Sequence, residues 1–341
     1  MTASHAPKPR LVIYGTGTYN SRVVRIAVQK GWPIVAAYNR AGGKVGRDLG
    51  RVCGLDRDIG VVVQDCEQAS YDRIEADVAI VAITDRLSQN FPAYQRLMNA
   101  GLNVICHGTE AYYPFGTDPE TAGRIDALAK KNHVTFTGSG IWDMSRIWAG
   151  ILVAGPCTEI KSLSHRSLTE SGRAGKHLMK VVGIGLSQEE YYEKNVRNPG
   201  GVGGMYKTIL HQVLDALGYT VTGVRERREP VLFAEPVYSK VLEQELAAGI
   251  CVGTRFIAEA ETAQGVTASA HIELRLFREG DVEHMMWAVE GKPSARITVE
   301  RDDSVHMSAA SLFNRVRDVM AAPAGIQVVS RLGPLHHTAL E

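Results

Sequence analysis

The chain has 341 residues, a length at which two domains are expected rather than one large core. Its formal net charge is +1, from 38 basic and 37 acidic side chains, which gives no electrostatic basis for binding nucleic acid or an anionic membrane. Hydrophobic residues make up 45% of the chain and charged residues 22%, as in ordinary soluble globular proteins. The expected partner is therefore a small molecule.

The cysteines and histidines argue against metal sites. The five cysteines are scattered and lack C-x-x-C spacing, so neither a disulfide framework nor a thiolate metal site is expected. His336-His337 has no third metal ligand at a useful spacing. Residues 1–10 lack the apolar stretch of a signal peptide, and the most apolar stretch, Ile147 to Val153, is too short to span a bilayer. We expect a cytoplasmic protein without a metal.

The first predicted elements surround a glycine-rich turn. An apolar run begins at Leu11, breaks at Gly15-Thr16-Gly17 and resumes with helical spacing, which predicts a strand, a tight turn and a helix. Gly15 would permit the turn, and Gly17 would let the pyrophosphate of a dinucleotide approach the helix N-terminus. Asn20 stands at the third glycine position of G-x-G-x-x-G, so we expect looser helix–strand packing there. The cofactor-binding residues predicted in this segment are Gly15, Thr16, Gly17, Thr18, Tyr19 and Asn20.

The second predicted strand, Ile34 to Tyr38, is followed by Asn39 and Arg40. In a nucleotide-binding fold, an acidic residue at this place would bind the ribose 2′-hydroxyl of NAD, whereas an arginine can pair with the 2′-phosphate of NADP. We therefore expect Asn39 and Arg40 to bind the cofactor, with NADP preferred and NAD also accepted. The alternative is that Arg40 is an exposed, solvated side chain.

The next segments repeat the alternation of strands and helices. Asp77 to Thr84 is strongly apolar, as expected for a strand buried on both faces of a parallel sheet. Six strands with intervening helices predict an α/β fold with a Rossmann-type doubly wound parallel sheet. Such sheets bind ligands at the carboxyl ends of their strands, so Thr84 and Asp85 are further predicted cofactor residues. The remaining strands are expected at 61–63, 102–106 and 133–137, with helices at 89–100 and 118–132.

Beyond Trp142 the pattern changes to long alternating segments. These predict a second, α+β domain with an open mixed sheet and helices on one face. An amphipathic helix at 308–320 is expected to return to the first domain, and the segment at 198–204 is either a substrate-loop hinge or a surface connector. The helices of the second domain are expected at 174–182, 188–193 and 205–217. The predicted domains are 1–140 for the cofactor, 141–304 for substrate binding and dimerisation, and 305–341 as a C-terminal segment.

The loop after the strand at 102–106 carries the first candidate for catalysis. Glu110 lies where the nicotinamide of a bound dinucleotide should project, among aromatic neighbours that would suit it to exchange protons with an amine near neutral pH. The alternative is an ordinary surface-loop glutamate. In the same loop, His107 and Gly108 are predicted to contact the cofactor, and His107 is also a candidate proton shuttle.

A substrate pocket is expected near the domain junction. Trp142 follows a glycine-rich segment there and would serve as a pocket wall or as a packing anchor. The residues predicted to line the pocket are Trp142, Ser139, Ile141 and His177.

Several segments together resemble the 2,4-diaminopentanoate dehydrogenase group. This group includes the native NAD(P)-dependent amine dehydrogenases and shares its architecture with dihydrodipicolinate reductase. The resemblance extends over most of the chain, and the segments that carry it are the glycine turn, Lys44 to Gly50, Cys106 to Glu110, Thr137 to Gly140, Phe313 to Val316 and Ala321 to Gly325.

The resemblance implies reductive amination of small ketones or aldehydes with ammonia to primary amines, and the reverse oxidative deamination. It implies that Glu110 handles the proton transfers and stabilises the iminium. Ser164 to Glu170 replaces the double-histidine and lysine signature of dihydrodipicolinate reductases, so that activity is not expected. An apolar sheet face in the second domain would be buried in a homodimer.

Three alternatives remain open. The chain is a 2,4-diaminopentanoate dehydrogenase, another small carbonyl or imine reductase, or, from a different class, a non-catalytic NADP-sensing protein. A simple monoamine is favoured over the diamine, because the sequence offers no clear second carboxylate for a distal amine.

Overall fold

The structure is a computed structural model, and it describes residues 7–72, 74–171, 179, 181–197, 206–240 and 242–339. The chain forms two compact units. Unit 1 comprises Met1–Met144 and Asp303–Glu341, and unit 2 comprises Ser145–Asp302. Unit 1 is thus built from both ends of the chain.

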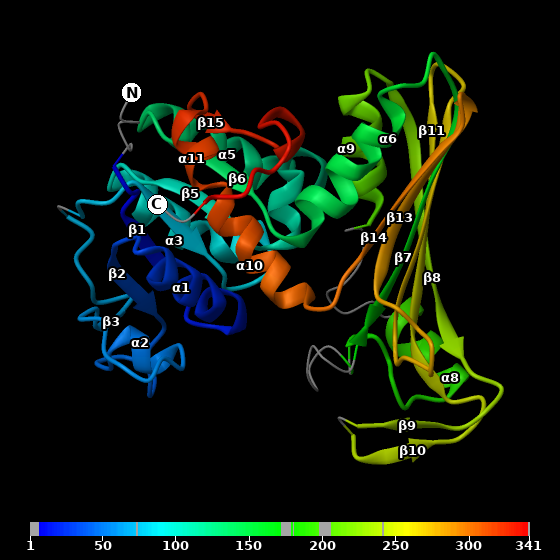
Figure 1. Ribbon diagram of the computed structural model, residues 1–341, viewed down its shortest axis with the longest axis horizontal. Coiled ribbons are helices and arrows are strands. Elements are labelled where there is room, and N and C mark those ends of the chain that lie inside the picture. The colour runs from blue at the N-terminus through cyan, green and yellow to red at the C-terminus, as the bar shows by residue number, and fades with distance from the viewer. Residues whose placement is uncertain are drawn as a thin grey trace. The chain divides into compact units, whose positions relative to one another are not determined.

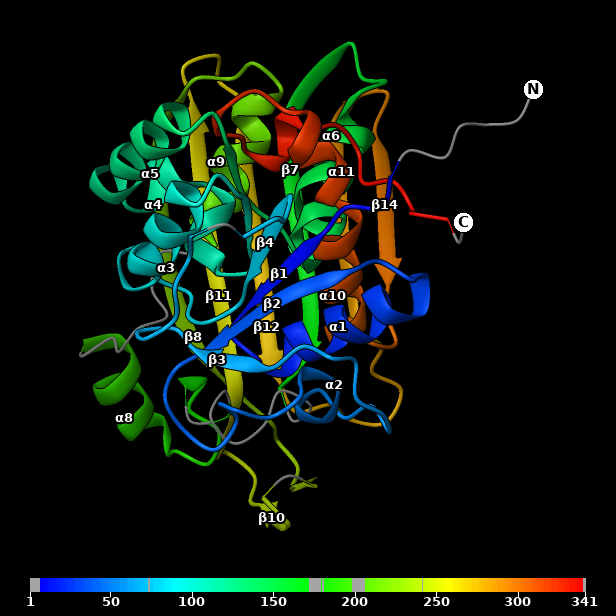
Figure 2. The same cartoon turned by 90° about the vertical axis from the view of Figure 1, so that its left-hand side faces the viewer.

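Unit 1 contains a seven-stranded parallel sheet (Figures 1 and 2). The strand order is β15-β6-β5-β4-β1-β2-β3, and the chain order reverses between β4 and β1. Every pair of neighbours is parallel, which confirms the predicted doubly wound sheet. The strands are β1 (Leu11–Tyr14), β2 (Ile34–Asn39), β3 (Val63–Asp65), β4 (Val78–Val81), β5 (Asn103–Cys106), β6 (Thr135–Gly138) and β15 (Gly325–Ile326).

Helices pack on both faces of this sheet. One face packs against α1 (Thr18–Lys30), α10 (Ser304–Asn314) and α11 (Val316–Ala321), and the other against α3 (Leu87–Asn99) and α5 (Pro119–Lys131). Local sequence sets their ends: Asp118 caps α5 by accepting a hydrogen bond from Thr121 N, and Gly31, at φ 65°, ends α1. Two short helices, α2 (Leu49–Val52) and α4 (Pro114–Thr117), complete the unit.

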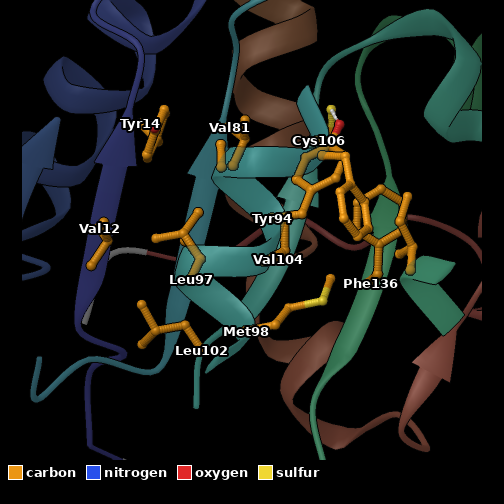
Figure 3. Packing of buried hydrophobic residues seen from close by; sticks show 14 of the residues in the cluster. Val12, Tyr14, Val81, Tyr94, Leu97, Met98, Leu102, Val104, Cys106 and Phe136 are labelled. Atoms are coloured by element: carbon orange, nitrogen blue, oxygen red, sulfur yellow. Dashed lines mark hydrogen bonds between the residues drawn. The ribbon is translucent and has the colours of Figure 1, made fainter. Parts of the chain in front are cut away.

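The core on the α3 face is apolar and closely packed (Figure 3). Leu97 and Met98 of α3 are fully buried against the sheet, where Val104 and Phe136 also have no exposed surface. The Tyr94 ring meets the Phe136 ring edge-on, with 4.9 Å between centroids. Burial on both sides of the sheet explains why every residue of β1 and β4 is hydrophobic and buried.

A buried ion pair joins the C-terminal segment to the rest of unit 1. Arg315 Nε and Nη2 each donate to one oxygen of the Asp143 carboxylate at 2.7 Å, and neither side chain is exposed. Arg315 Nη2 also donates to Gly333 O, and Ser139 Oγ donates to Asp143. Burial opposes the charged guanidinium, but hydrogen bonds to Asp143 and Asp318 raise the pKa of Arg315 above its usual value.

Unit 2 contains a six-stranded mixed sheet in the order β14-β13-β7-β12-β11-β8. Only β7 and β12 are parallel, and the other neighbours are antiparallel. The strands are β7 (Glu159–Glu170), β8 (Val221–Leu232), β11 (Cys251–Thr262), β12 (Thr267–Arg275), β13 (His284–Lys292) and β14 (Ala295–Glu300). Further elements in the described part of the unit are α6 (Ala149–Ala154), α8 (Gln188–Tyr191), η4 (Tyr192–Arg197), α9 (Lys207–Ala216) and the hairpin of β9 (Val237–Ser239) and β10 (Gln244–Leu246).

The two faces of the unit 2 sheet differ. Figure 1 shows α6 and α9 on one face, where Gly150 of α6 lies so close to Trp287 that an added Cβ would meet the ring at 2.9 Å. The opposite face carries cross-strand ion pairs, such as the pair of Arg255 and Glu273, and a hollow of about 470 Å³. The apolar sheet face expected from the sequence is therefore covered by the unit's own helices, and the opposite face is polar. The hollow is lined by Ser164, Arg166, His284, Met286, Ala288, Arg296, Thr298 and Glu300.

Several boundaries differ from the sequence predictions. The single helix expected at 308–320 is divided at Arg315 into α10 and α11, and β15 was missed because two residues after Pro323 read as a loop. The helix expected at 174–182 and the segment 198–204 lie largely or wholly outside the described residues. Within the described part of the chain, no helix combines the length and the apolar character needed to cross a membrane.

We predict that Arg315→Met lowers the free energy of unfolding by about 3–5 kcal/mol, because it leaves the Asp143 carboxylate buried without its cation. Urea unfolding of the purified variant measures this. The matched control is Lys130→Met, which removes an exposed pair with Asp126 and should cost less than about 1 kcal/mol. Equal stability of the two variants would contradict the role given to Arg315.

Candidate functional site

The candidate site lies at the carboxyl edge of the unit 1 sheet. β4 stands between β1 and β5 in the sheet, so the loops that follow these three strands emerge side by side. These loops hold the glycine turn, Asp85 and Glu110. Ligands of doubly wound sheets bind at this edge, near the point where the strand order reverses.

The glycine turn has the geometry of an anion cradle. Gly15 adopts φ +86°, and a Cβ there would lie 2.4 Å from Ala82 O, so only glycine fits. Gly17, the N-cap residue of α1, is exposed, and a Cβ there would meet nothing within 4 Å. The first turn of α1 has no side-chain cap and no acidic residue, which leaves its N-terminus suited to a pyrophosphate.

Asn20 fixes this turn rather than loosening it. Its side chain is fully buried, and Nδ2 donates to the carbonyl oxygens of Tyr14, Gly15 and Ile80 at 2.8–3.1 Å. The amide therefore ties the start of α1 to β1 and β4. These hydrogen bonds connect the helix to the strands at the place where a third glycine would allow close helix–strand contact.

The end of β2 contributes polar and cationic groups. Asn39 Oδ1 accepts from Thr16 N at 3.3 Å, and Arg40 is exposed. Lys44, which the sequence analysis did not assign to the site, donates from Nζ to Thr16 O at 2.6 Å. The segment from Arg40 to Arg47 contains three cations and no carboxylate, a signal that would have pointed to Lys44.

The loops after β4 and β5 are bound to each other. Thr84 Oγ1 donates to Asn90 Oδ1, and Asp85 Oδ1 accepts from Thr109 N at 3.1 Å. Gly108 is buried against Thr84 O, where a Cβ would approach to 2.6 Å. The predicted cofactor residues Thr84, Asp85 and Gly108 thus lie together and fix the two loops.

His107 is held between two unit 1 elements. Its ring stacks on Tyr19 with centroids 3.8 Å apart, and Nε2 is 2.8 Å from Ser308 Oγ. Burial lowers the pKa of His107 to about 4, so the ring is neutral near pH 7. A neutral imidazole that is hydrogen-bonded to a serine favours the predicted role of His107 as a cofactor contact over its role as a proton shuttle.

Glu110 lies in the 3-10 turn η1 (Thr109–Tyr112), directly after β5. Its Oε1 accepts from Arg86 Nη1 and its Oε2 from Leu87 N, both at 2.8 Å. Its side chain is 15% exposed. A cation and a backbone amide therefore orient the carboxylate. The aromatic neighbours of Glu110 are evident from the sequence, whereas its pairing with Arg86, 24 residues earlier, is not.

The described residues predicted to line the substrate pocket each contact a different side chain or backbone group of the protein. The Trp142 ring packs 5.2 Å from the Tyr112 ring, and Ile141 N donates to Ser308 Oγ. Ser139 Oγ donates to Asp143 at 2.9 Å. His177 lies outside the described residues. Among the residues that the structure describes, no cluster of histidine, cysteine or acidic side chains could hold a metal ion.

A doubly wound sheet with a glycine turn, followed by a unit with a mixed sheet, is a two-unit fold that solved oxidoreductases also have. An oxidoreductase from Agrobacterium radiobacter, solved with NAD+, has this fold at a TM-score of 0.59 and 11% identity, over 96% of this chain and 93% of its own. The chain belongs to the 2,4-diaminopentanoate dehydrogenase family. The family model, for the C-terminal domain of 2,4-diaminopentanoate dehydrogenase, matches residues 149–339, more than half of the chain.

Two relatives agree with this assignment. An amine dehydrogenase from Mycobacterium smegmatis is 28% identical and superposes with a TM-score of 0.87, over 98% of each chain. The 2,4-diaminopentanoate dehydrogenase of Acetoanaerobium sticklandii is 29% identical over 162 residues, which cover 46% of this chain and 45% of that protein. The matches confirm the expected family and oxidoreductase class and contradict the non-catalytic alternative.

Two glycine substitutions should separate folding from cofactor binding. We predict that Gly17→Ala weakens NADPH binding by about tenfold or more and keeps the free energy of unfolding within about 1 kcal/mol of the wild type. The added Cβ meets no protein atom within 4 Å, but it would occupy space that a bound pyrophosphate needs. Gly15→Ala should instead lower the free energy of unfolding by at least about 1–3 kcal/mol. The alanine would have a positive φ, and its Cβ would clash with Ala82 O. Fluorescence titration and thermal unfolding measure the two effects. NADPH binding by Gly17→Ala at the wild-type affinity would refute the cradle.

Proposed function

We propose that the chain is an NAD(P)H-dependent amine dehydrogenase that converts small ketones or aldehydes and ammonia to primary amines, and catalyses the reverse deamination. The observation that carries this proposal is Glu110, a carboxylate oriented by two donors at the carboxyl end of β5, in the sheet that holds the glycine turn. The two relatives described above carry out chemistry of the same class by their names, an amine dehydrogenase and a 2,4-diaminopentanoate dehydrogenase.

The residues of unit 1 suit a dinucleotide. Gly17 leaves room for the pyrophosphate at the N-terminus of α1, and Asn39 and Arg40 lie where the adenosine ribose is expected. When bound, the nicotinamide would supply the hydride. Arg40 and Lys44 bring positive charge to the end of β2, which supports NADP over NAD while leaving NAD acceptable.

Glu110 would act on the nitrogen of the substrate. A carboxylate at this place accepts a proton as ammonia adds to the carbonyl carbon and returns one as water leaves. It also attracts the positive charge that develops as the carbinolamine becomes an iminium. We assign it these roles, with Thr18 and Tyr19 beside the cofactor and Trp142, Ser139, Ile141 and His177 near the substrate.

The organisation follows from this proposal. We assign cofactor binding to residues 1–140 and 305–341 and substrate binding to residues 141–304, in a homodimer located in the cytoplasm. Two observations support the assembly and the location. All five cysteines are free thiols, and Arg166, Arg296 and Glu300 are among the residues that line a hollow on the unit 2 sheet, where charged groups of a second copy can pair. Sedimentation of the purified protein tests the dimer.

The reaction is tested by NADPH oxidation with a small ketone such as cyclohexanone near pH 9, with and without a high ammonium concentration. We predict ammonium-dependent turnover that yields a primary amine. In Glu110→Gln, kcat should fall by about 10²–10⁴-fold while NADPH binding is retained, since the amide keeps the bond to Leu87 N but cannot exchange the proton. Oxidation that does not need ammonium would identify a carbonyl reductase instead, and a fully active Glu110→Gln would exclude Glu110.

The cofactor preference depends on Arg40. We predict that Arg40→Ala weakens NADPH binding about 10- to 100-fold and leaves NADH binding within twofold, because only NADPH carries the phosphate that the guanidinium would bind. Dissociation constants for both cofactors measure this. Arg51→Ala is the control, since Arg51 is half exposed and pairs with Asp58. An unchanged preference in Arg40→Ala would refute the assignment.

A further inference from the structure

The partners of Glu110 form a clamp made of two loops. Arg86 Nη1 and Leu87 N each bind one oxygen of the carboxylate at 2.8 Å. Each oxygen therefore has one fixed donor and keeps a further lone pair for another. The carboxylate cannot rotate without losing one of the two bonds.

The donor Leu87 N belongs to the first residue of α3. The N-cap residue of that helix is Arg86, whose side chain makes no capping hydrogen bond, and the first turn contains no acidic residue. Glu110, which follows a different strand, supplies the missing capping oxygen. A carboxylate at the N-terminus of a 13-residue helix is stabilised by the helix dipole as well as by the hydrogen bond.

The backbone keeps the two loops at a fixed separation. Thr109 N donates to Asp85 Oδ1 at 3.1 Å, and Glu110 N donates to Asp85 O at 3.2 Å. Asp85 precedes Arg86, so the residues that anchor the turn adjoin those that bind the carboxylate. The pair of Arg86 and Glu110 is thus built into the loop structure and differs from a chance contact between long surface side chains.

We propose that Arg86 is a positioning residue that orients the Glu110 carboxylate for the proton transfers at the substrate nitrogen; this rests on the amine dehydrogenase function proposed above. The side chain of Arg86 is 42% exposed, so water screens its charge and the carboxylate keeps its attraction for a second cation. The guanidinium fixes the direction of the oxygen, and the free lone pairs accept the proton. Arg86 acts through Glu110.

The test compares Arg86→Met, Arg86→Lys and the control Arg51→Met. Arg51 also forms an ion pair, with Asp58 at 2.7 Å, and is 50% exposed, but its hydrogen bonds go to Asp56 and Asp58 and to no residue of the loops after β4 and β5. Arg86→Met should lower kcat for ammonium-dependent reduction about 10- to 100-fold, because a catalytic carboxylate displaced by about 1 Å slows the reaction by up to about that factor. The KM for NADPH should stay within twofold. Arg86→Lys should recover part of the loss, and added guanidinium ion should partly rescue Arg86→Met but have no effect on Arg51→Met.

Two further measurements distinguish positioning from a structural role. Thermal unfolding of each variant should match the wild type within a few degrees. In the Glu110→Gln background, single-turnover rates with and without Arg86→Met should agree within threefold, because a residue that acts through Glu110 has nothing left to orient.

The proposal is overturned if Arg86→Met keeps the wild-type kcat, if its loss tracks unfolding, or if the losses of the two substitutions multiply. An active wild type with an unaffected Arg86→Met leaves the proposed function standing and removes only this inference. A wild type that forms no amine removes the proposed function, and the role of Arg86 falls with it.

Discussion

The architecture of unit 1 depends on the buried pair between Asp143 and Arg315. Asp143 lies just beyond β6, and Arg315 separates α10 from α11, so one guanidinium joins two parts of the chain 172 residues apart. The same guanidinium binds Gly333 O and Asp318. A buried charge is costly unless it is fully paired, and here each carboxylate oxygen has its own donor. The pair therefore fixes where the chain leaves and re-enters the unit.

The candidate site depends on a second constraint, the alignment of parallel strands. β1, β4 and β5 end at one edge, so groups from three loops meet without any of them being close in sequence. The polar groups at this edge are mostly engaged with one another: Asn20 binds three carbonyl oxygens, and Asp85 holds the turn that carries Glu110. Such mutual bonds keep a site rigid before its ligands arrive, which is what orientation of reacting groups requires.

The sequence predicted the features that local pattern determines. The apolar run at 77–84 indicated a strand buried on both faces, and all four residues of β4 are buried. The run of Gly15-Thr16-Gly17 between two apolar segments predicted a tight turn from a strand to a helix, and Gly15 adopts the positive φ that such a turn favours in glycine. The family was also identified correctly, from segments spread along most of the chain.

Features that depend on distant pairing could not be predicted in this way. β15 has two residues and exists because it pairs with β6, about 190 positions earlier in the chain. Arg86 and Glu110 are 24 residues apart. Nothing in the sequence of either loop indicates that Glu110 caps the N-terminus of α3. Asn20 departs from the glycine pattern, and its three hydrogen bonds become visible only once β1 and β4 are adjacent.

The division of unit 1 between the two ends of the chain has a consequence for biosynthesis. On the ribosome, residues 1–144 emerge first, without α10, α11 and β15. The apolar surface that Leu312 and Phe313 later cover, next to Trp32, then stays exposed to water until α10 has been synthesised. Unit 2, which is continuous in sequence, can finish folding earlier. The nascent chain thus passes through a stage in which unit 1 exposes apolar surface that its C-terminal segment later buries.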